Sequence, residues 1–263
     1  MPSSSLSSVT KSRALPAKLA REISSSLRLQ HEIEHAQYLA GRAGLIWNWE
    51  SPAGKIRWQR RVELLRSSLN NKMKVLELGC GTGYFTRQLA ATGASIIAMD
   101  ISPQLLAIAR GECPAANVEF LLGNAYALEL PNSSFDAVVG SSILHHLEIT
   151  PALAEIYRVL RPGGIVRFTE PNMLNPQIAI QKQVPFIKKA LGDSPDETAF
   201  FRWPLRRLMQ KSRFKAIEIT PFDFLHPWLP AAWINIVQSI GELLEHTPII
   251  NEIAGSLFIK ASK

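Results

Sequence analysis

The sequence predicts an α/β fold in which a mostly parallel sheet of seven strands carries helices on both of its faces. Between residues 73 and 170, short β-rich apolar runs alternate with helical patterns, the order typical of parallel strands joined by crossover helices. Two further strand patterns follow at 214–219 and 254–261. A glycine-rich turn at 79–83 comes directly after the first strand pattern, where parallel sheets of this kind place a ligand.

Each element of the central region has a local signal. Ser102-Pro103 and Thr150-Pro151 each supply an N-cap followed by a proline, which favours the start of a helix. Gly93 and Gly111 stand where a helix end needs a left-handed residue. The expected strands are 74–78, 95–99, 117–121, 135–140 and 164–169, and the expected helices are about 83–92, 102–110 and 150–159.

We expect three regions along the chain. Residues 1–30 are predicted to form a flexible, basic, serine-rich tail; a transit peptide is the alternative, since the tail lacks the apolar core of a secretory signal. Residues 31–72 are predicted to form a helical cap, and 73–263 the main domain. We expect lid insertions at about 171–212 and 221–252, because connections of that length usually have helices and a function of their own.

Composition excludes some classes of protein. The most apolar segment, 225–240, is interrupted by Pro227 and Pro230 and is too short for a membrane-spanning helix, which needs about 18 apolar residues. Only two cysteines are present, so we expect no disulfide framework and a soluble cytoplasmic protein. The net charge of +7 comes from the two flanks of the central region, residues 1–72 and 171–263. This surplus allows contact with an anionic membrane surface or with nucleic acid, and a solvated face with no partner explains it as well.

The spacing in the glycine-rich turn argues against a nicotinamide or flavin enzyme. Gly83 follows Gly79 by four residues, whereas a dinucleotide fold needs its third glycine after five, a position that Tyr84 occupies. Glu77 places a carboxylate beside the turn, where it could hold a cationic amino-acid group. Asp100 ends the second strand, where its carboxylate could accept hydrogen bonds from both hydroxyls of a ribose. The alternative for Asp100 is an acid at a helix N-terminus.

These features together resemble the class I S-adenosylmethionine-dependent methyltransferases, of the small-molecule type called methyltransferase type 11, which have a Rossmann-like fold. Further matching segments follow in the family's order and cover about 73–170: Gly123-Asn124-Ala125, Phe135-Asp136-Ala137-Val138-Val139, Ser141-Ser142-Ile143-Leu144-His145-His146-Leu147 and Leu160-Arg161-Pro162-Gly163-Gly164. The resemblance implies S-adenosylmethionine as cofactor and a methyltransferase activity. It implies the cofactor-binding residues Glu77, Gly79, Cys80, Gly81, Thr82, Gly83, Asp100, Ile101, Asn124, Ala125 and Ser141.

A hydroxyl or amine acceptor has to lose a proton, and three side chains at the ends of the fourth and fifth strands are candidates to remove it. The resemblance favours His145 paired with Glu170, and His146 is the neighbouring candidate. The alternative is that one histidine caps a helix or packs beside the cofactor. We expect no metal site.

The acceptor is expected to be small and apolar, aromatic, or linked to a lipid or sugar, because large aromatic groups gather outside the matched region. A decorated core is the alternative explanation of these groups, which are Trp47, Trp49, Trp58, Phe222, Phe224, His226, Trp228 and Trp233. Basic flanks beside an apolar lid would permit transient contact with a membrane surface.

Two other functions stay open on the sequence. One is methylation of RNA or protein, and the other is a non-catalytic cofactor-binding protein of the same fold. We do not expect nucleic acid as a partner, because base-methylating enzymes usually carry an Asn/Asp-Pro-Pro-aromatic run where this chain has Gly140-Ser141-Ser142-Ile143.

Overall fold

The computed structural model describes residues 27–40 and 48–263. Most of the predicted N-terminal tail lies outside these residues. Trp47 also lies outside them. Two helices, α2 (Leu27–Leu39) and α4 (Pro52–Arg66), lie in the region of the predicted cap, and α2 begins before residue 31.

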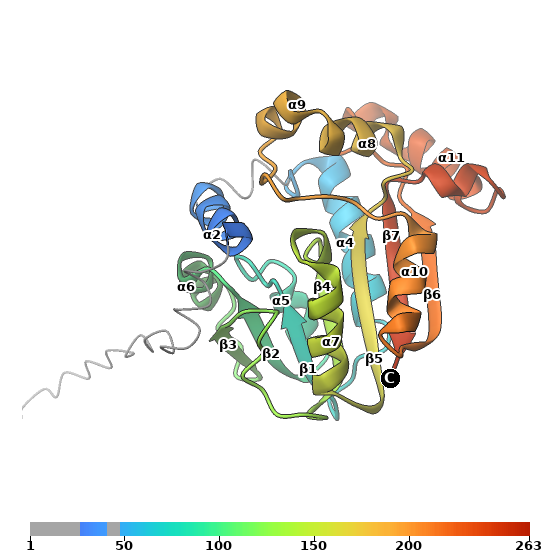
Figure 1. The fold of residues 1–263 in the computed structure, drawn as a ribbon. Coiled ribbons are helices and arrows are strands. Elements are labelled where there is room, and N and C mark those ends of the chain that lie inside the picture. The colour runs from blue at the N-terminus through green and yellow to red at the C-terminus, as the bar shows by residue number, and fades with distance from the viewer. Residues whose placement is uncertain (1–26, 41–47) are drawn as a thin grey trace, which may run out of the picture.

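The strands of the described residues form one seven-stranded sheet in the order β3-β2-β1-β4-β5-β7-β6 (Figure 1). The first five strands along the chain are parallel, and β7 pairs antiparallel with both β5 and β6. The expectation of a mostly parallel, seven-stranded sheet is therefore confirmed. The strands are β1 (Lys74–Leu78), β2 (Ser95–Asp100), β3 (Val118–Leu122), β4 (Phe135–Ser141), β5 (Leu160–Pro171), β6 (Lys215–Phe222) and β7 (Ser256–Ser262).

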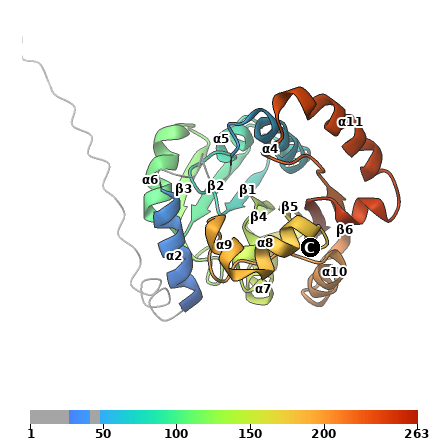
Figure 2. The same ribbon diagram turned by 90° about the horizontal axis from the view of Figure 1, so that it is seen from above.

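Helices cover both faces of this sheet (Figure 2). The two faces have separate cores: α7 and α10 pack on one, and α4, α5 and α6 pack on the other. Phe135 and Phe168 are among the largest fully buried side chains, and burial of one such group contributes about 1.5–3 kcal/mol. The helices are α5 (Thr86–Ala90), α6 (Pro103–Glu112), α7 (Ile149–Val159), α8 (Pro176–Gln183), α9 (Pro185–Ala190), α10 (Arg202–Lys211) and α11 (Ile234–Glu245), with 3-10 turns η1 (Leu144–His146), η2 (Ala231–Trp233) and η3 (Ile250–Ile253).

Three local expectations were wrong. The helix after the glycine turn is only α5, because residues 81–85 are taken up by turns. Gly111 does not end its helix in a left-handed conformation; it lies inside α6, and the helix is followed by Cys113. Thr150 does not cap α7, which begins at Ile149 after Glu148, without a side-chain cap. Pro151 is tolerated there because amide groups of the first helical turn have no intrahelical partner. Gly93 does adopt a left-handed conformation, with φ 78°.

The carboxyl edge of the parallel strands is covered by segments from outside the matched region. Figure 1 shows α8 and α9 above the end of β5, and α2 beside the edge near α6. Within residues 27–40 and 48–263, no helix combines the length and apolar composition needed to cross a bilayer.

Candidate active site

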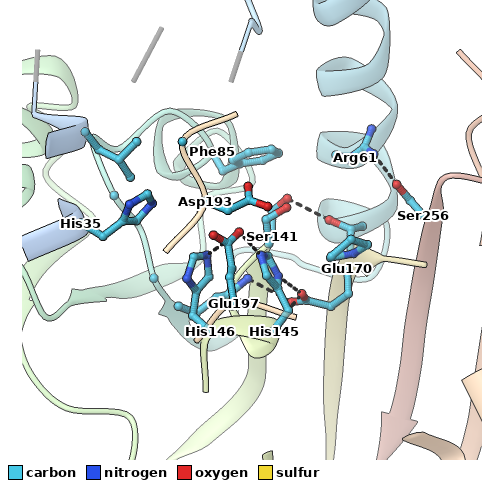
Figure 3. A pocket seen from close by; sticks show the side chains of 18 of the residues that line it. His35, Arg61, Phe85, Ser141, His145, His146, Glu170, Asp193, Glu197 and Ser256 are labelled. Atoms are coloured by element: carbon cyan, nitrogen blue, oxygen red, sulfur yellow. Dashed lines mark hydrogen bonds and ion pairs between the residues drawn. The ribbon is translucent and has the colours of Figure 1, made fainter. Parts of the chain in front are cut away.

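A cavity of about 530 Å³ lies at the carboxyl edge of the sheet, within the range of about 300–1,000 Å³ typical of small-molecule sites. Its wall combines the turn after β1 and the ends of β2, β4 and β5 with α2, α8 and the segment after β6. Residues far apart in the sequence therefore face one space, as the close-up in Figure 3 shows.

The glycine turn requires glycine on steric grounds. Gly79, Gly81 and Gly83 have φ values of 65°, 55° and 80°, a region that side chains with a Cβ rarely adopt. A Cβ at Gly79 would lie 2.5 Å from Cδ1 of Ile143, too close for any other residue. Gly79, Cys80 and Gly81 line the cavity, whereas Thr82 and Gly83 do not.

Asp100 lines the same cavity and is only 9% exposed. Its Oδ2 accepts a hydrogen bond from the amide of Gly81 at 2.8 Å, and its Oδ1 accepts one from the amide of Ser102, the N-cap of α6, at 2.9 Å. Burial raises the pKa of the carboxyl group, and the backbone hydrogen bonds oppose this rise. Asp100 thus fixes the glycine turn against the start of α6 and presents a carboxylate to the cavity.

Four other predicted cofactor residues also line the cavity: Ile101, Asn124, Ala125 and Ser141. The Oδ1 of Asn124 accepts a hydrogen bond from the amide of Tyr126 at 2.9 Å, which fixes the side chain. The hydroxyl groups of Ser141 and Thr169 are 2.8 Å apart across the ends of β4 and β5.

Glu77 is placed differently from the sequence expectation. Its side chain is buried and is not among those that line the cavity. Side chains alternate along β1, so Leu76 and Leu78 belong to the core under α7 while Glu77 faces Thr86 and α5. Burial raises the pKa of Glu77 to about 7, against the effect of Thr86, and its Oε2 has no hydrogen-bond partner among the described residues. A direct role for Glu77 in cofactor binding stays a prediction.

His145 lies between two buried carboxylates (Figure 3). Its Nδ1 is 2.7 Å from Oε2 of Glu170, the partner expected from the sequence, and its Nε2 is 3.0 Å from Oε1 of Glu197. Burial lowers the pKa of the imidazole, but the hydrogen bonds and charges of both carboxylates outweigh it and raise the pKa to about 9.

Glu170 also fixes the backbone that carries the histidines. Its Oε1 accepts hydrogen bonds from the amides of Ile143 and Leu144, at 3.0 and 2.8 Å, where the chain leaves β4 and enters η1. A carboxylate is favoured at these amides, which would otherwise have no partner. The end of β5 therefore sets the direction in which the turn after β4 presents its side chains.

Only one ring nitrogen of His146 is within hydrogen-bond distance of a partner among the described residues. Its Nδ1 is 2.8 Å from Oε2 of Glu32 on α2, while its Nε2 is 3.7 Å from Oε1 of Glu197, beyond hydrogen-bond distance. Burial raises the pKa of Glu32, but the hydrogen bonds from His146 and Ser194 and the charge of His146 outweigh it, so the pKa is lowered.

Glu197 is the carboxylate that joins the two histidines. Its Oε1 also accepts a hydrogen bond from Nζ of Lys182 at 2.8 Å, and its Oε2 accepts one from the amide of Ser194 at 2.7 Å. Burial raises the pKa of Glu197, but His146, His145 and Lys182 hold it well below its usual range. We call His145, His146 and Glu197 the His-His-Glu cluster.

Known proteins are similar to the part of the chain that carries the glycine turn, Asp100 and the two histidines. Residues 76–168 match the family described as a methyltransferase domain. The demethylmenaquinone methyltransferase of Thermus thermophilus is 34% identical over 161 residues, which cover 57% of this chain and 73% of the relative. This chain belongs to the S-adenosylmethionine-dependent methyltransferases. A malonyl-[acyl-carrier protein] O-methyltransferase of Serratia marcescens is 38% identical over 97 residues, and only 36% of this methyltransferase and 37% of that relative align.

Solved structures show that the methyltransferase fold extends over most of the chain. A methyltransferase of Thermotoga maritima has a TM-score of 0.63 at 19% identity, with 86% of this chain and 98% of that chain covered. An N-methyltransferase of Bradyrhizobium japonicum, solved with S-adenosylhomocysteine, has a TM-score of 0.54 at 15% identity, with 82% and 91% covered. At these identities the likeness concerns the fold alone.

The cofactor of this methyltransferase is S-adenosylmethionine, and the residues present fit it. Gly79 and Gly81 line the cavity and have no side chains, so a ligand can approach their backbone closely. Asp100 offers carboxylate oxygens in the same space, next to Asn124. The glycine turn, Asp100 and Asn124 would hold the cofactor on the side of β1 to β3. The two histidines of the His-His-Glu cluster follow the end of β4, on the other side of the cavity.

The sequence did not indicate Glu32, Lys182, Asp193 or Glu197. The only signal was the acidic run Asp193-Ser194-Pro195-Asp196-Glu197, inside the segment predicted as a lid. No spacing relates that run to the histidines. Its position depends on tertiary contacts such as the hydrogen bond from the amide of Thr198 to the carbonyl of His145, at 3.2 Å.

Proposed function

We propose that this methyltransferase transfers a methyl group to a small acceptor with an apolar or aromatic part, which includes acceptors linked to a lipid or sugar. The observation that carries the proposal is that one cavity joins the glycine turn to an aromatic wall. Trp49, Phe85, Phe224 and Trp228 all line it. Aromatic faces bury a large area and stack on planar groups, so such a wall suits an apolar acceptor better than a polar one.

Some of the aromatic side chains expected around the acceptor support this proposal and others do not. Trp49, Phe224, His226 and Trp228 line the cavity. Three do not: Trp58, Phe222 and Trp233. Trp228 is 69% exposed at the cavity wall, where its face is open to a ligand.

The names of the relatives support a small or carrier-linked acceptor. Two of them are called demethylmenaquinone methyltransferase and malonyl-[acyl-carrier protein] O-methyltransferase. The exposed side chains of Phe186 and Ile180, on α9 and α8, add apolar surface to the same edge of the molecule. Such a surface favours an acceptor that is presented at a lipid interface.

For a hydroxyl or amine acceptor, we propose that His146 removes the proton. Bound S-adenosylmethionine supplies a methyl group that is already activated for transfer. The candidate favoured from sequence, His145, has both ring nitrogens within hydrogen-bond distance of carboxylates, so neither is available to an acceptor while Glu197 keeps this position. Glu32 orients neutral His146 through Nδ1, and the contact of Nε2 with Glu197, at 3.7 Å, is too long for a hydrogen bond, so Nε2 is the nitrogen that would accept the proton. His145 and Glu170 then act as positioning residues for the turn.

A methylation screen with isotope-labelled S-adenosylmethionine tests the proposed acceptor class. The full chain is incubated with panels of hydroxylated aromatics, quinols, acyl thioesters, RNA and proteins, and labelled products are identified by mass spectrometry. We expect label only on the apolar small or carrier-linked acceptors. We also expect Phe224→Ala to raise the KM for the acceptor about tenfold without changing the affinity for S-adenosylmethionine. Label on RNA or protein alone would contradict the proposal.

A further inference from the structure

The His-His-Glu cluster has the ligand types and spacing of a metal site. One atom from each of His145, His146 and Glu197 lies within 4.8 Å of the other two. The Oε1 of Glu197 is 3.0 Å from Nε2 of His145 and 3.7 Å from Nε2 of His146. Two ligands about 2.0–2.1 Å from a tetrahedral ion lie roughly 3.3 Å apart. The two distances to Glu197 therefore bracket the spacing that one ion would require.

The opposite ring nitrogens are arranged as in histidines that bind metals. Metal-binding histidines almost always direct their second ring nitrogen to a carboxylate or carbonyl oxygen, which fixes the tautomer and the ring orientation. Here the Nδ1 of His145 is 2.7 Å from Glu170 and that of His146 is 2.8 Å from Glu32. Both Nε2 atoms thus point toward Glu197, from two consecutive residues of one turn.

The surroundings of the cluster are rich in negative charge. Besides Glu197, the carboxylates of Glu170, Glu32 and Asp193 lie in or next to it, and Lys182 contacts both Glu197 and Asp193. A buried carboxylate without a positive partner is costly. Two additional positive charges, either two protonated imidazoles or one divalent cation, would reduce this excess to the same extent.

We propose that His145, His146 and Glu197 bind one divalent transition-metal ion of the Zn²⁺, Fe²⁺ or Mn²⁺ type. Two imidazoles and one carboxylate form the ligand set of several catalytic zinc and non-haem iron sites, which leave a coordination position open. Lys182 keeps Asp193 as a partner, at 2.9 Å, when Glu197 turns to the ion. This site could not be predicted from sequence, because Glu197 is 51 residues from His146 in the chain and only folding brings them together.

The site would give the ion a role in the proposed methyl transfer. All three ligands line the cavity that also contains the glycine turn and the aromatic wall. An ion there would bind an oxygen of the acceptor and lower the pKa of its hydroxyl group, so the hydroxyl would lose its proton to water. His146 would then be a ligand of the ion, and this step would replace proton removal by His146. This role rests on the proposed function, whereas metal binding itself does not.

Metal uptake by the purified full chain tests the proposal. Protein stripped with a chelator is titrated with Zn²⁺ in competition with a chromophoric indicator, and with Co²⁺ while visible absorption is recorded. We expect one ion per chain and Co²⁺ bands typical of nitrogen and oxygen ligands. We expect His146→Gln and Glu197→Gln each to weaken binding at least tenfold, and Glu32→Gln, which changes only the partner of His146, to weaken it about 10–100-fold.

Two controls make the result decisive. His246 is exposed at the end of α11, so His246→Ala should leave uptake unchanged if binding is specific to the cluster. Circular dichroism of each metal-free variant shows whether it is folded. No uptake by the wild-type chain would overturn the proposal, and so would uptake that His146→Gln and Glu197→Gln both retain.

The same experiments separate this inference from the proposed function. If the metal-free chain methylates its acceptor at the full rate and binds no ion, the metal site is wrong and the proposed function stands. If the chain binds one ion through the cluster but labels only RNA or protein, the metal site stands and the proposed acceptor class is wrong.

Discussion

Glu77 shows how a single buried residue makes stability depend on pH. The pKa of its carboxyl group is raised from 4.5 to about 7 in the folded protein, mainly by burial. Between these two values the unfolded chain has lost the proton that the folded protein keeps. Because the folded state binds more protons, the free energy of unfolding falls as pH rises from about 4.5 to about 7 and is constant above that range.

We predict that Glu77→Gln removes this loss. A shift of this size corresponds to a difference on the order of 3 kcal/mol between pH 4.5 and pH 8. Chemical denaturation of the two proteins across this range would measure it, and the variant should be the more stable at pH 8. Glu119→Gln, at an exposed position of β3, is the matched control. An equal pH dependence in wild type and Glu77→Gln would contradict the assignment.

At the scale of elements, α4 is attached to the segment after β6 by buried ion pairs. Arg57 and Arg61 contact Oδ2 of Asp223 at 2.9 and 2.7 Å, and Arg60 forms a double contact with Glu245 at the end of α11. Burial lowers the pKa of Arg61 to about 10, so the guanidinium group is still protonated at neutral pH. These contacts hold together the regions 31–72 and 221–252, which were predicted from sequence only as separate additions to the domain.

We predict that Arg61→Ala lowers the free energy of unfolding by about 3–5 kcal/mol, because it leaves Asp223 buried with one cation fewer and removes a hydrogen bond to Ser256. Lys55→Ala on the same helix breaks only an exposed pair with Glu50 and should cost about 0.5 kcal/mol or less. Urea denaturation of both variants measures the difference. Similar losses in the two variants would argue against a buried, structural pair.

Features of this fold that have a local cause could be predicted from the sequence. The strand β2 was predictable because residues 96–99 are all apolar, and Gly79 because glycine suits a turn at positive φ. Gly111 was wrongly predicted to end its helix. A side chain at this exposed position of α6 would meet no other atom, so neither the local conformation nor packing requires a glycine there. Glu32 and Glu197 had no local cause: α2 and the segment before α10 bring them to His146 through tertiary contacts. On this side of the cavity, the two histidines and Glu170 were therefore predictable and their carboxylate partners Glu32 and Glu197 were not.

For the whole molecule, the structure explains part of the basic charge that the sequence placed on its flanks. Three arginines of the N-terminal flank, Arg57, Arg60 and Arg61, pair inside the protein rather than face solvent as a patch. This reduces the charge available to a nucleic-acid partner and agrees with a small acceptor. Two of these arginines, Arg57 and Arg61, line the cavity together with Asp223, so the flanks have a part in forming the site.

The central claim is that the glycine turn and Asp100 bind S-adenosylmethionine, and calorimetric titration of the full chain tests it most directly. We predict one molecule of S-adenosylmethionine or S-adenosylhomocysteine bound per chain, no detectable binding of NAD, and an affinity for both sulfur compounds that is weaker by about 1–3 kcal/mol in Asp100→Asn. Binding of NAD without binding of either sulfur compound would contradict the account, and an unchanged affinity in a folded Asp100→Asn would contradict the role of Asp100.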